Sequence, residues 1–240
     1  MLANRLRDLD PSFFLKQSIL KSVPMTFRVF AEGKTDHAHL RAALAYFNTV
    51  EGRFTDLKLI HDTTTTGDQD LYRRCEAFAT VAQPTPMVFV FDRDNPEILP
   101  KVTDRGAPFK DWGNDVFSLA LPIPAHRKAD EQLCIEMLYA DDVLLRRDGG
   151  GRRLYLKNEF DQQTGIHPTE NVVCQNIKAR ALVREEDVFD LTSHNKVSLS
   201  KQAFATAIGS KEPPFEGVTF EGFRGLMELL DSIRVLRFAK

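Results

Sequence analysis

Two short apolar runs that each end in acidic residues place the strongest constraint on this chain. Residues 27–31 are followed by Glu32, and residues 87–91 are followed by Asp92 and Asp94. Runs of this kind are typical of buried parallel strands, and the carboxyl ends of such strands form the edge at which open α/β sheets bind ligands. The three acids are therefore expected in one small volume. Crowded carboxylates repel one another unless a divalent cation lies among them, so the pattern indicates metal chemistry.

The segments around these runs alternate between strand and helix patterns. This alternation predicts an α/β fold with a Rossmann-like, doubly wound parallel sheet, in which right-handed crossovers bring every strand's carboxyl end to the same edge. Besides the two strands above, the predicted elements are a helix over 37–50, a strand over 57–60, a helix over 71–81, a strand over 116–122, and helices over 130–145, 198–208 and 220–235. The stretch 158–198 has no assignable pattern.

The predicted organisation has three parts. An amphipathic N-terminal helix over 1–26 precedes an α/β core over 27–145, and a helical C-terminal elaboration with a basic loop follows over 146–240. No apolar run approaches the roughly 20 residues of a membrane helix. The opening residues lack a signal peptide's apolar core, which favours a cytoplasmic protein. The three cysteines are an odd number and widely spaced, so we expect them to be reduced.

The motifs carry a resemblance to a known domain. Glu32-Gly33 after a first strand and Asp92-x-Asp94 after a later one resemble the two halves of a TOPRIM domain, which topoisomerases, primases and OLD-type nucleases share. The resemblance covers roughly residues 27–145, about half of the chain. It implies a TOPRIM fold for the core.

Three further residues resemble the OLD-type nuclease branch. Asp36 follows Glu32 by one helical turn, Glu136 lies in a later segment, and Lys201 begins a terminal helix pattern. In size and layout the chain is similar to stand-alone TOPRIM effectors of anti-phage systems such as PARIS. The sequence has no ATPase P-loop, so the resemblance implies a separate ABC-type ATPase as partner.

The chemistry that such a set would perform is phosphodiester hydrolysis. Two Mg²⁺ or Mn²⁺ ions about 4 Å apart can polarise the phosphoryl group, activate water and stabilise the leaving oxygen. We expect Asp92 and Asp94 to bind one ion, Glu32, Asp36 and Glu136 to lie on or near the other, and Lys201 to balance charge in the transition state. The expected catalytic residues are Glu32, Asp92, Asp94 and Lys201.

Each weaker candidate also has an ordinary structural interpretation. Asp36 is equally suited to capping the helix that follows it. Glu136 has the pattern of a solvent-facing helical residue, and Lys201 that of a solvated lysine. His37 and His39 are expected at the surface.

A basic stretch surrounds three consecutive glycines. Arginines bind phosphates through bidentate contacts, and the chain's net charge of −2 means that a polyanion would be held by such local groups. A solvated loop is the equally good alternative. The candidate nucleic-acid-binding residues are Arg146, Arg147, Arg152, Arg153 and Lys157.

The sequence leaves other functions open. The tetrad Tyr139-Ala140-Asp141-Asp142 is one that reverse transcriptases carry, but its surroundings favour a helix and the chain is short for a polymerase. Asp92-x-Asp94 also resembles the opening motif of haloacid dehalogenase-like phosphatases. The sequence favours a Mg²⁺-dependent endonuclease of anti-phage defence that cuts DNA or tRNA, with a homodimer as a further possible assembly. The alternatives are a non-catalytic TOPRIM-scaffold binding module and a metal-dependent phosphatase or nucleotidyl transferase.

Overall fold

The computed structural model describes residues 24–239 apart from 63, 65–66, 105–106 and 212. The predicted N-terminal helix over 1–26 therefore falls almost wholly outside the described residues. Where the description begins, the chain already enters the first strand, β1, which starts at Met25 rather than at residue 27.

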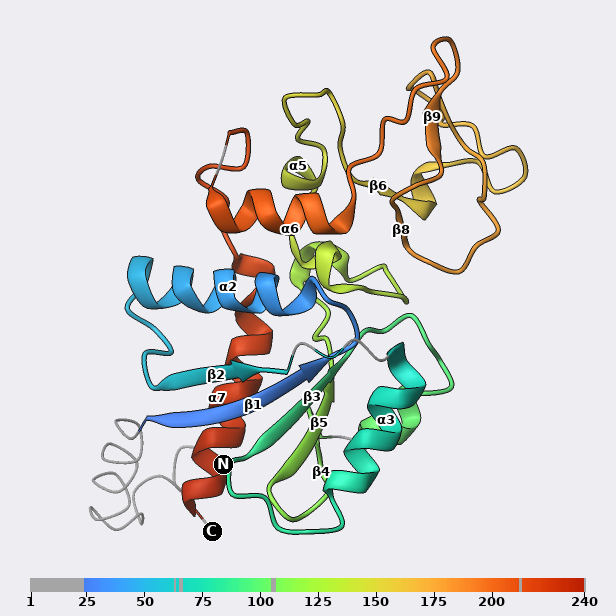
Figure 1. Cartoon of the computed structure of the whole chain (residues 1–240). Coiled ribbons are helices and arrows are strands. Elements are labelled where there is room, and N and C mark those ends of the chain that lie inside the picture. The colour runs from blue at the N-terminus through green and yellow to red at the C-terminus, as the bar shows by residue number, and fades with distance from the viewer. Residues whose placement is uncertain (1–23, 63, 65–66, 105–106, 212, 240) are drawn as a thin grey trace, which may run out of the picture.

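A five-stranded sheet with the order β2-β1-β3-β5-β4 forms the centre of the molecule (Figure 1). All neighbouring pairs are parallel except β4 and β5, so an antiparallel edge strand closes one side. The prediction of an α/β fold with a mostly parallel sheet is confirmed. The strands are β1 (Met25–Ala31), β2 (Leu57–His61), β3 (Met87–Phe91), β4 (Lys110–Asp111) and β5 (Val116–Ala120).

Helices cover both faces of this sheet because alternate residues of each strand point to opposite sides. Val29 packs in the core on the face covered by α2 (Asp36–Val50) and α7 (Arg224–Ala239). Phe30 packs on the other face, under α3 (Gly67–Phe78) and α4 (Leu99–Val102), and stacks on Phe89 with ring centroids 4.5 Å apart. Two apolar cores thus hold the sheet in place.

The predicted helix over 130–145 is wrong. The chain instead forms three short helical turns, which are η1 (Ala125–Arg127), η2 (Ile135–Leu138) and α5 (Asp141–Leu144). Residues 133–139 are all buried, so no amphipathic helix face exists there. Side chains take over part of the backbone hydrogen bonding: Arg127 Nε donates to the Met137 carbonyl at 3.1 Å, and His126 Nε2 donates to the Tyr139 carbonyl at 3.1 Å.

The C-terminal part contributes to two different cores. Helix α6 (Lys201–Ser210) packs against α2, and η4 (Glu221–Phe223) leads into α7, so the predicted helices over 198–208 and 220–235 are confirmed with small shifts. The unassigned stretch 158–198, together with residues 155–156 before it, forms two short antiparallel strand pairs, with the turn η3 (Lys157–Glu159) at its start. The pair β7–β9 packs in a separate apolar cluster, whereas Leu156 and Val183 of the pair β6–β8 belong to the main core. These strands are β6 (Tyr155–Leu156), β7 (Val172–Cys174), β8 (Val183–Arg184) and β9 (Val188–Asp190).

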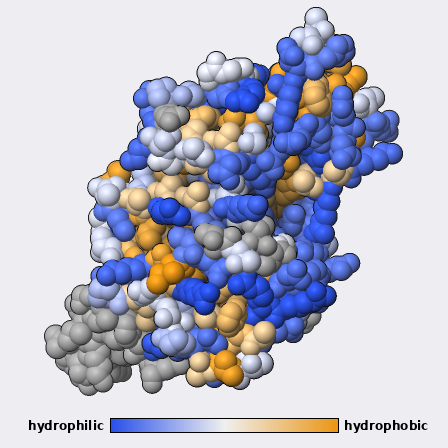
Figure 2. Space-filling model, viewed as in Figure 1, coloured by the Kyte–Doolittle hydropathy of each residue, from blue (hydrophilic) through white to orange (hydrophobic). Residues whose placement is uncertain are grey.

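The outer surface is mixed in character. On the face shown in Figure 2, hydrophilic residues predominate and apolar residues form separate patches. Within the described part of the chain, no helix has the length and apolar content needed to span a membrane.

Candidate functional site

The ends of β1 and β3 bring the first two predicted site residues together. The strands pair in parallel with Ala31 opposite Val90, which sets Glu32 beside the end of β3. The Asp92 backbone N–H donates to Glu32 Oε1 at 3.0 Å. The sequence prediction that acids of two strands meet at one sheet edge is therefore correct for this pair.

Asp36 joins them through a tight turn. The Gly33 N–H donates to Asp36 Oδ2 at 2.7 Å, so this carboxylate fixes the turn before α2 instead of capping the helix with its side chain. Gly33 has an ordinary φ, and the need for glycine is one of space: a Cβ at this position would lie 2.7 Å from Asp36 Oδ1. Asp36 is buried.

Glu136 and Lys201 form a buried ion pair under the same edge. Glu136 is fully buried, and Lys201 Nζ lies 3.1 Å from its Oε2. Among the described residues, no donor makes a well-directed hydrogen bond to either Glu136 oxygen. Lys201 is placed by the start of α6, where Ser200 Oγ caps the helix by accepting from the Ala203 N–H at 3.1 Å. The alternatives of a solvent-facing Glu136 and a fully solvated Lys201 are both wrong.

Asp94 lies at the outer side of the group, with Asp68 and Arg180. Arg180 Nη2 donates to the Asp94 carbonyl at 2.9 Å and lies 3.8 Å from Asp94 Oδ1 and 3.9 Å from Asp68 Oδ2. Asn95 Nδ2 donates to Asp68 Oδ2. Together these acids form one group, the acidic cluster, which consists of Glu32, Asp36, Asp68, Asp92, Asp94 and Glu136.

Burial and mutual repulsion raise the pKa of three of these acids. Burial, with the charges of Asp94, Asp68 and Asp36, raises the pKa of Glu32 to about 7 against the opposing hydrogen bond from Asp92. Burial and the charge of Glu136 raise the pKa of Asp36 to about 6. Burial and the charges of Asp36, Glu32 and Glu136 raise the pKa of Asp92 well above its usual range. Ionising all of these acids together is therefore unfavourable in the metal-free cluster.

The Glu136–Lys201 pair behaves differently. Burial alone would raise the pKa of Glu136, but the charge of Lys201 outweighs it and leaves the pKa below its ordinary value. Burial likewise opposes the charged form of Lys201, yet the charges of Glu136 and its neighbours raise the pKa of the ammonium group. Both groups are therefore ionised at neutral pH.

Two histidines that the sequence placed at the surface are buried. His39 is fully buried, with Nδ1 2.9 Å from the Tyr139 hydroxyl, and burial lowers its pKa to about 4. His37 is also buried and its ring lies 5.2 Å from that of His61 between centroids. His39 is therefore neutral at pH 7, and both His39 and Tyr139 lie close enough to Glu136 to interact with its charge.

The acidic cluster offers the donor atoms that a divalent cation needs. Carboxylate oxygens are the donors that Mg²⁺ and Mn²⁺ prefer, and the buried, unsatisfied Glu136 oxygens lie close enough to Asp36 and Asp92 for their charges to interact. Within the described part of the chain, however, no three His, Cys, Asp or Glu side chains are already gathered around a single ion position. The donor chemistry fits a hard cation, and the arrangement is not a complete protein cage.

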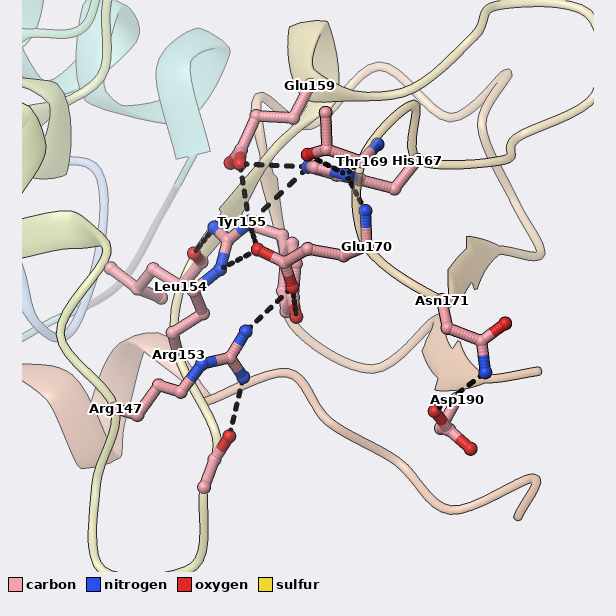
Figure 3. A network of polar contacts seen from close by, with 11 residues as sticks. Arg147, Arg153, Leu154, Tyr155, Glu159, His167, Thr169, Glu170, Asn171 and Asp190 are labelled. Atoms are coloured by element: carbon pink, nitrogen blue, oxygen red, sulfur yellow. Dashed lines mark hydrogen bonds and ion pairs between the residues drawn. The ribbon is translucent and has the colours of Figure 1, made fainter. Parts of the chain in front are cut away.

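The expected phosphate-binding arginines include one that serves another purpose (Figure 3). Arg153 is buried; its Nη2 donates to Glu159 at 2.8 Å and to Glu170 at 2.7 Å, and its guanidinium carbon lies 3.7 Å above the Tyr155 ring. Arg147 Nη2 donates to Glu170 Oε2 at 2.7 Å. Arg153 as a nucleic-acid contact is therefore a wrong prediction, because both its carboxylate partners belong to the chain.

The other basic candidates remain partly accessible but also have partners within the chain. Arg146 donates to the Pro214 carbonyl at 3.0 Å, Arg152 pairs with Asp148 at 2.7 Å, and Lys157 Nζ donates to the Ala179 carbonyl at 2.9 Å. Their role in binding nucleic acid stays a prediction.

Sequence reasoning missed Asp68, Arg180 and Tyr139 as neighbours of the site, and it expected His39 beside the site but at the surface. Asp68 lies in the first turn of α3, directly after the loop that follows β2, and this position was a usable signal because the carboxyl ends of the strands form that edge. Arg180 lies in the stretch without an assignable pattern and gave no local signal.

In comparisons with known proteins, no family model, curated protein or solved structure matches the chain.

Proposed function

We propose that this chain is a Mg²⁺- or Mn²⁺-dependent nuclease that hydrolyses phosphodiester bonds at the acidic cluster. The observation that carries the proposal is the gathering of buried and half-buried acids at the carboxyl edge of the sheet, where Glu32, Asp36 and Asp92 all have a raised pKa. Holding like charges together in a buried place opposes folding, and strongly perturbed acids of this kind gather at functional sites. A scaffold used only for binding has no need of them.

A divalent cation is the group that best relieves this repulsion. Mg²⁺ is commonly held by one or two carboxylates and completes its coordination with waters and substrate phosphates, so it does not require a full protein cage. Asp92 and Asp94 would hold one ion, with Glu32, Asp36 and Glu136 on or near a second ion. When bound, the metal lowers the pKa of water and offsets the charge on the phosphoryl group.

The chain's own cations complete the proposed chemistry. Lys201 keeps its positive charge beside Glu136 and supports negative charge that develops on the phosphoryl group. Arg180 lies at the outer side of the cluster, where its exposed guanidinium can bind a neighbouring phosphate. Substrate phosphate would then be held between a buried and an exposed cation.

The wider setting is part of the same proposal. The TOPRIM resemblance and the role of a cytoplasmic anti-phage effector released or activated by a separate ATPase rest on the sequence motifs. The acidic cluster supports the hydrolytic activity in this proposal. DNA and tRNA both present the phosphodiester that the site would hydrolyse.

The test is a cleavage assay on plasmid DNA, single-stranded DNA and total tRNA with Mg²⁺, Mn²⁺ or EDTA. The wild-type protein is compared with Glu32→Ala and with Glu97→Ala, an exposed acid on the loop after β3 that serves as matched control. We expect metal-dependent cleavage that Glu32→Ala loses by more than a hundredfold and Glu97→Ala retains. Cleavage by Glu32→Ala at the wild-type rate would refute the mechanism. Hydrolysis of a small phosphoester without cleavage of any polynucleotide would replace the nuclease by a phosphatase.

A further inference from the structure

A cavity of about 680 Å³ lies beside the acidic cluster, where the sheet edge meets the segment after β6. Its lining comes from residues of the segment 93–99 after β3, from residues 129–132 with Met137, and from residues of the segment 156–162 with Leu182. This volume is within the range of small-ligand sites, which are commonly found where two parts of a fold meet.

The cavity and the acidic cluster share their border. Arg93, which stands between Asp92 and Asp94 in the sequence, lines the cavity. Gln132 also lines it, and its Nε2 donates to the Asp94 carbonyl at 3.3 Å. A molecule with its phosphate at the acidic cluster can therefore place the adjoining group in this cavity.

The lining does not suit a second phosphate. Asp130 and Glu131 line it together with the cations Arg93 and Lys157, so the lining has no excess of positive charge. Each cation also uses one donor within the chain: Arg93 Nε donates to the Leu121 carbonyl at 2.5 Å and Lys157 Nζ to the Ala179 carbonyl at 2.9 Å. An uncharged group is therefore a better occupant than a phosphate.

The same lining suits a nucleobase. The buried side chains of Met137, Leu156 and Phe160 offer an apolar surface to a ring. Around it, Gln132 and the exposed Asn158 supply amide groups that both donate and accept, and carboxylates accept from exocyclic amino groups. Asn158 has no side-chain hydrogen-bond partner among the described residues, so its amide is available to a ligand.

We propose that this cavity binds the base of an unpaired nucleotide next to the bond that is cut, so that the substrate is single-stranded or extruded nucleic acid and not an intact duplex. The nucleotide must be unpaired because a paired base is stacked and cannot enter such a cavity. The inference rests on the proposed nuclease function, which places the cleaved bond at the neighbouring acidic cluster. The cavity thereby selects among polynucleotides while the acidic cluster performs hydrolysis.

The test measures binding without metal, which separates it from catalysis. Fluorescein-labelled single-stranded DNA and RNA of mixed sequence, and the matching duplexes, are titrated with protein in EDTA and followed by anisotropy. Ala129→Trp places an indole on the exposed lining of the cavity, and Ala125→Trp makes the same change at an exposed alanine outside it. We expect single strands to bind at least tenfold more tightly than duplexes, and Ala129→Trp to remove that preference while Ala125→Trp keeps it.

The binding results separate the role of the cavity from that of the catalytic site. Equal affinity for duplex and single strand, or an unchanged preference in Ala129→Trp, overturns the inference even if the protein cleaves nucleic acid. If Ala129→Trp fails to fold, Asn158→Ala replaces it as a smaller change at an exposed residue. We expect this variant to bind single strands about threefold more weakly than the wild type. Binding to single strands that Ala129→Trp abolishes supports the cavity even if the nuclease assay fails, so the two proposals fail separately.

Discussion

Two groups of charged side chains in this molecule both contain glutamates, and the pKa of a glutamate is shifted in opposite directions in the two groups. In the network of Figure 3, Arg153 and Arg147 share Glu170, and although burial opposes it, the hydrogen bonds and charges of that network lower the Glu170 pKa to about 2. In the acidic cluster, burial and like charges raise the Glu32 pKa to about 7.

The difference lies in where the opposing charge comes from. The network around Arg153 is neutralised within the chain, and its ion pairs join η3 to the segment before β7. The acidic cluster contains one internal ion pair, Glu136–Lys201, and its other acids lack a matching cation in the described residues except for the distant contacts of Arg180. The first arrangement holds the fold together, and the second favours an external cation.

The largest expected effect comes from breaking the buried pair in the acidic cluster. Lys201→Met leaves the fully buried Glu136 without its partner, and losing one member of a buried pair costs about 3 to 5 kcal/mol. Urea unfolding should show this loss. Lys196→Met is the matched control, because its partner Glu186 is 81% exposed and such surface pairs contribute about 1 kcal/mol or less. The double variant Lys201→Met with Glu136→Gln should recover most of the loss; an unrescued double variant would show that Lys201 acts through packing instead.

The second effect tests the neutralised network. Arg153→Leu removes a guanidinium whose side chain is only 2% exposed and which serves both Glu159 and Glu170. Those acids are partly accessible to water, so we expect a loss of about 2 to 3 kcal/mol in the free energy of unfolding. Arg152→Leu, which removes an arginine that is 49% exposed, should cost less than about 1 kcal/mol. Equal losses in the two variants would contradict the structural role of the network around Arg153.

The third effect is a pH dependence that has opposite signs in the two groups. The folded-state pKa of Glu32 is raised from 4.5 to about 7, so the native state binds the extra proton and stability falls as pH rises through this window. The Glu170 pKa is lowered from 4.5 to about 2, so its stabilisation is present above pH 4.5 and is lost as pH falls towards 2. The free energy of unfolding is measured in EDTA at pH 5 and at pH 7.5. Its decrease between these two pH values should be smaller in Glu32→Gln than in the wild type, by up to about 3 kcal/mol. The control Glu97→Gln should follow the wild type, and a wild-type protein without any decline would refute the raised pKa.

The smallest effect is the response of stability to metal. If the acidic cluster binds Mg²⁺, the ion should stabilise the folded protein by roughly 1.4 kcal/mol at ten times its Kd, which for a chain of this size is a rise of about 3 to 5 °C in Tm. Thermal unfolding at pH 8 with and without MgCl₂ measures it. Asp92→Asn should lose the response and Glu97→Gln should keep it. A response that survives in Asp92→Asn would place the ion elsewhere.

The sequence predicted the part of the site that depends on strand ends. The apolar runs before Glu32 and Asp92 have only one good structure, a buried strand, and parallel pairing then brings the following residues together. The positions of Glu32 and Asp92 follow from local sequence and the topology of a parallel sheet. Lys201 was named through the resemblance to the OLD-type nuclease branch, and its local pattern alone favoured a solvated lysine.

The remainder depends on contacts between distant segments. Glu136 was assigned to a helix, yet its segment runs through the interior, where Arg127 and His126 replace helical hydrogen bonds to two carbonyls. The partners of Arg153 lie 6 and 17 residues away, across turns that show no periodic pattern. A sequence pattern records which face of an element is apolar, but not which polar groups meet across a core.

At the turn before α2, the residue that is allowed at position 33 depends on the residue at position 36. Because a side chain at residue 33 would collide with the Asp36 carboxylate, the two positions constrain each other through volume, not through backbone conformation. A lineage that loses the acid at 36 frees position 33 to vary, whereas a lineage that keeps the acid in its present position, bonded to the N–H of residue 33, favours the glycine. Joint retention of this pair across diverged sequences would therefore trace the inheritance of the site itself, separately from that of the fold.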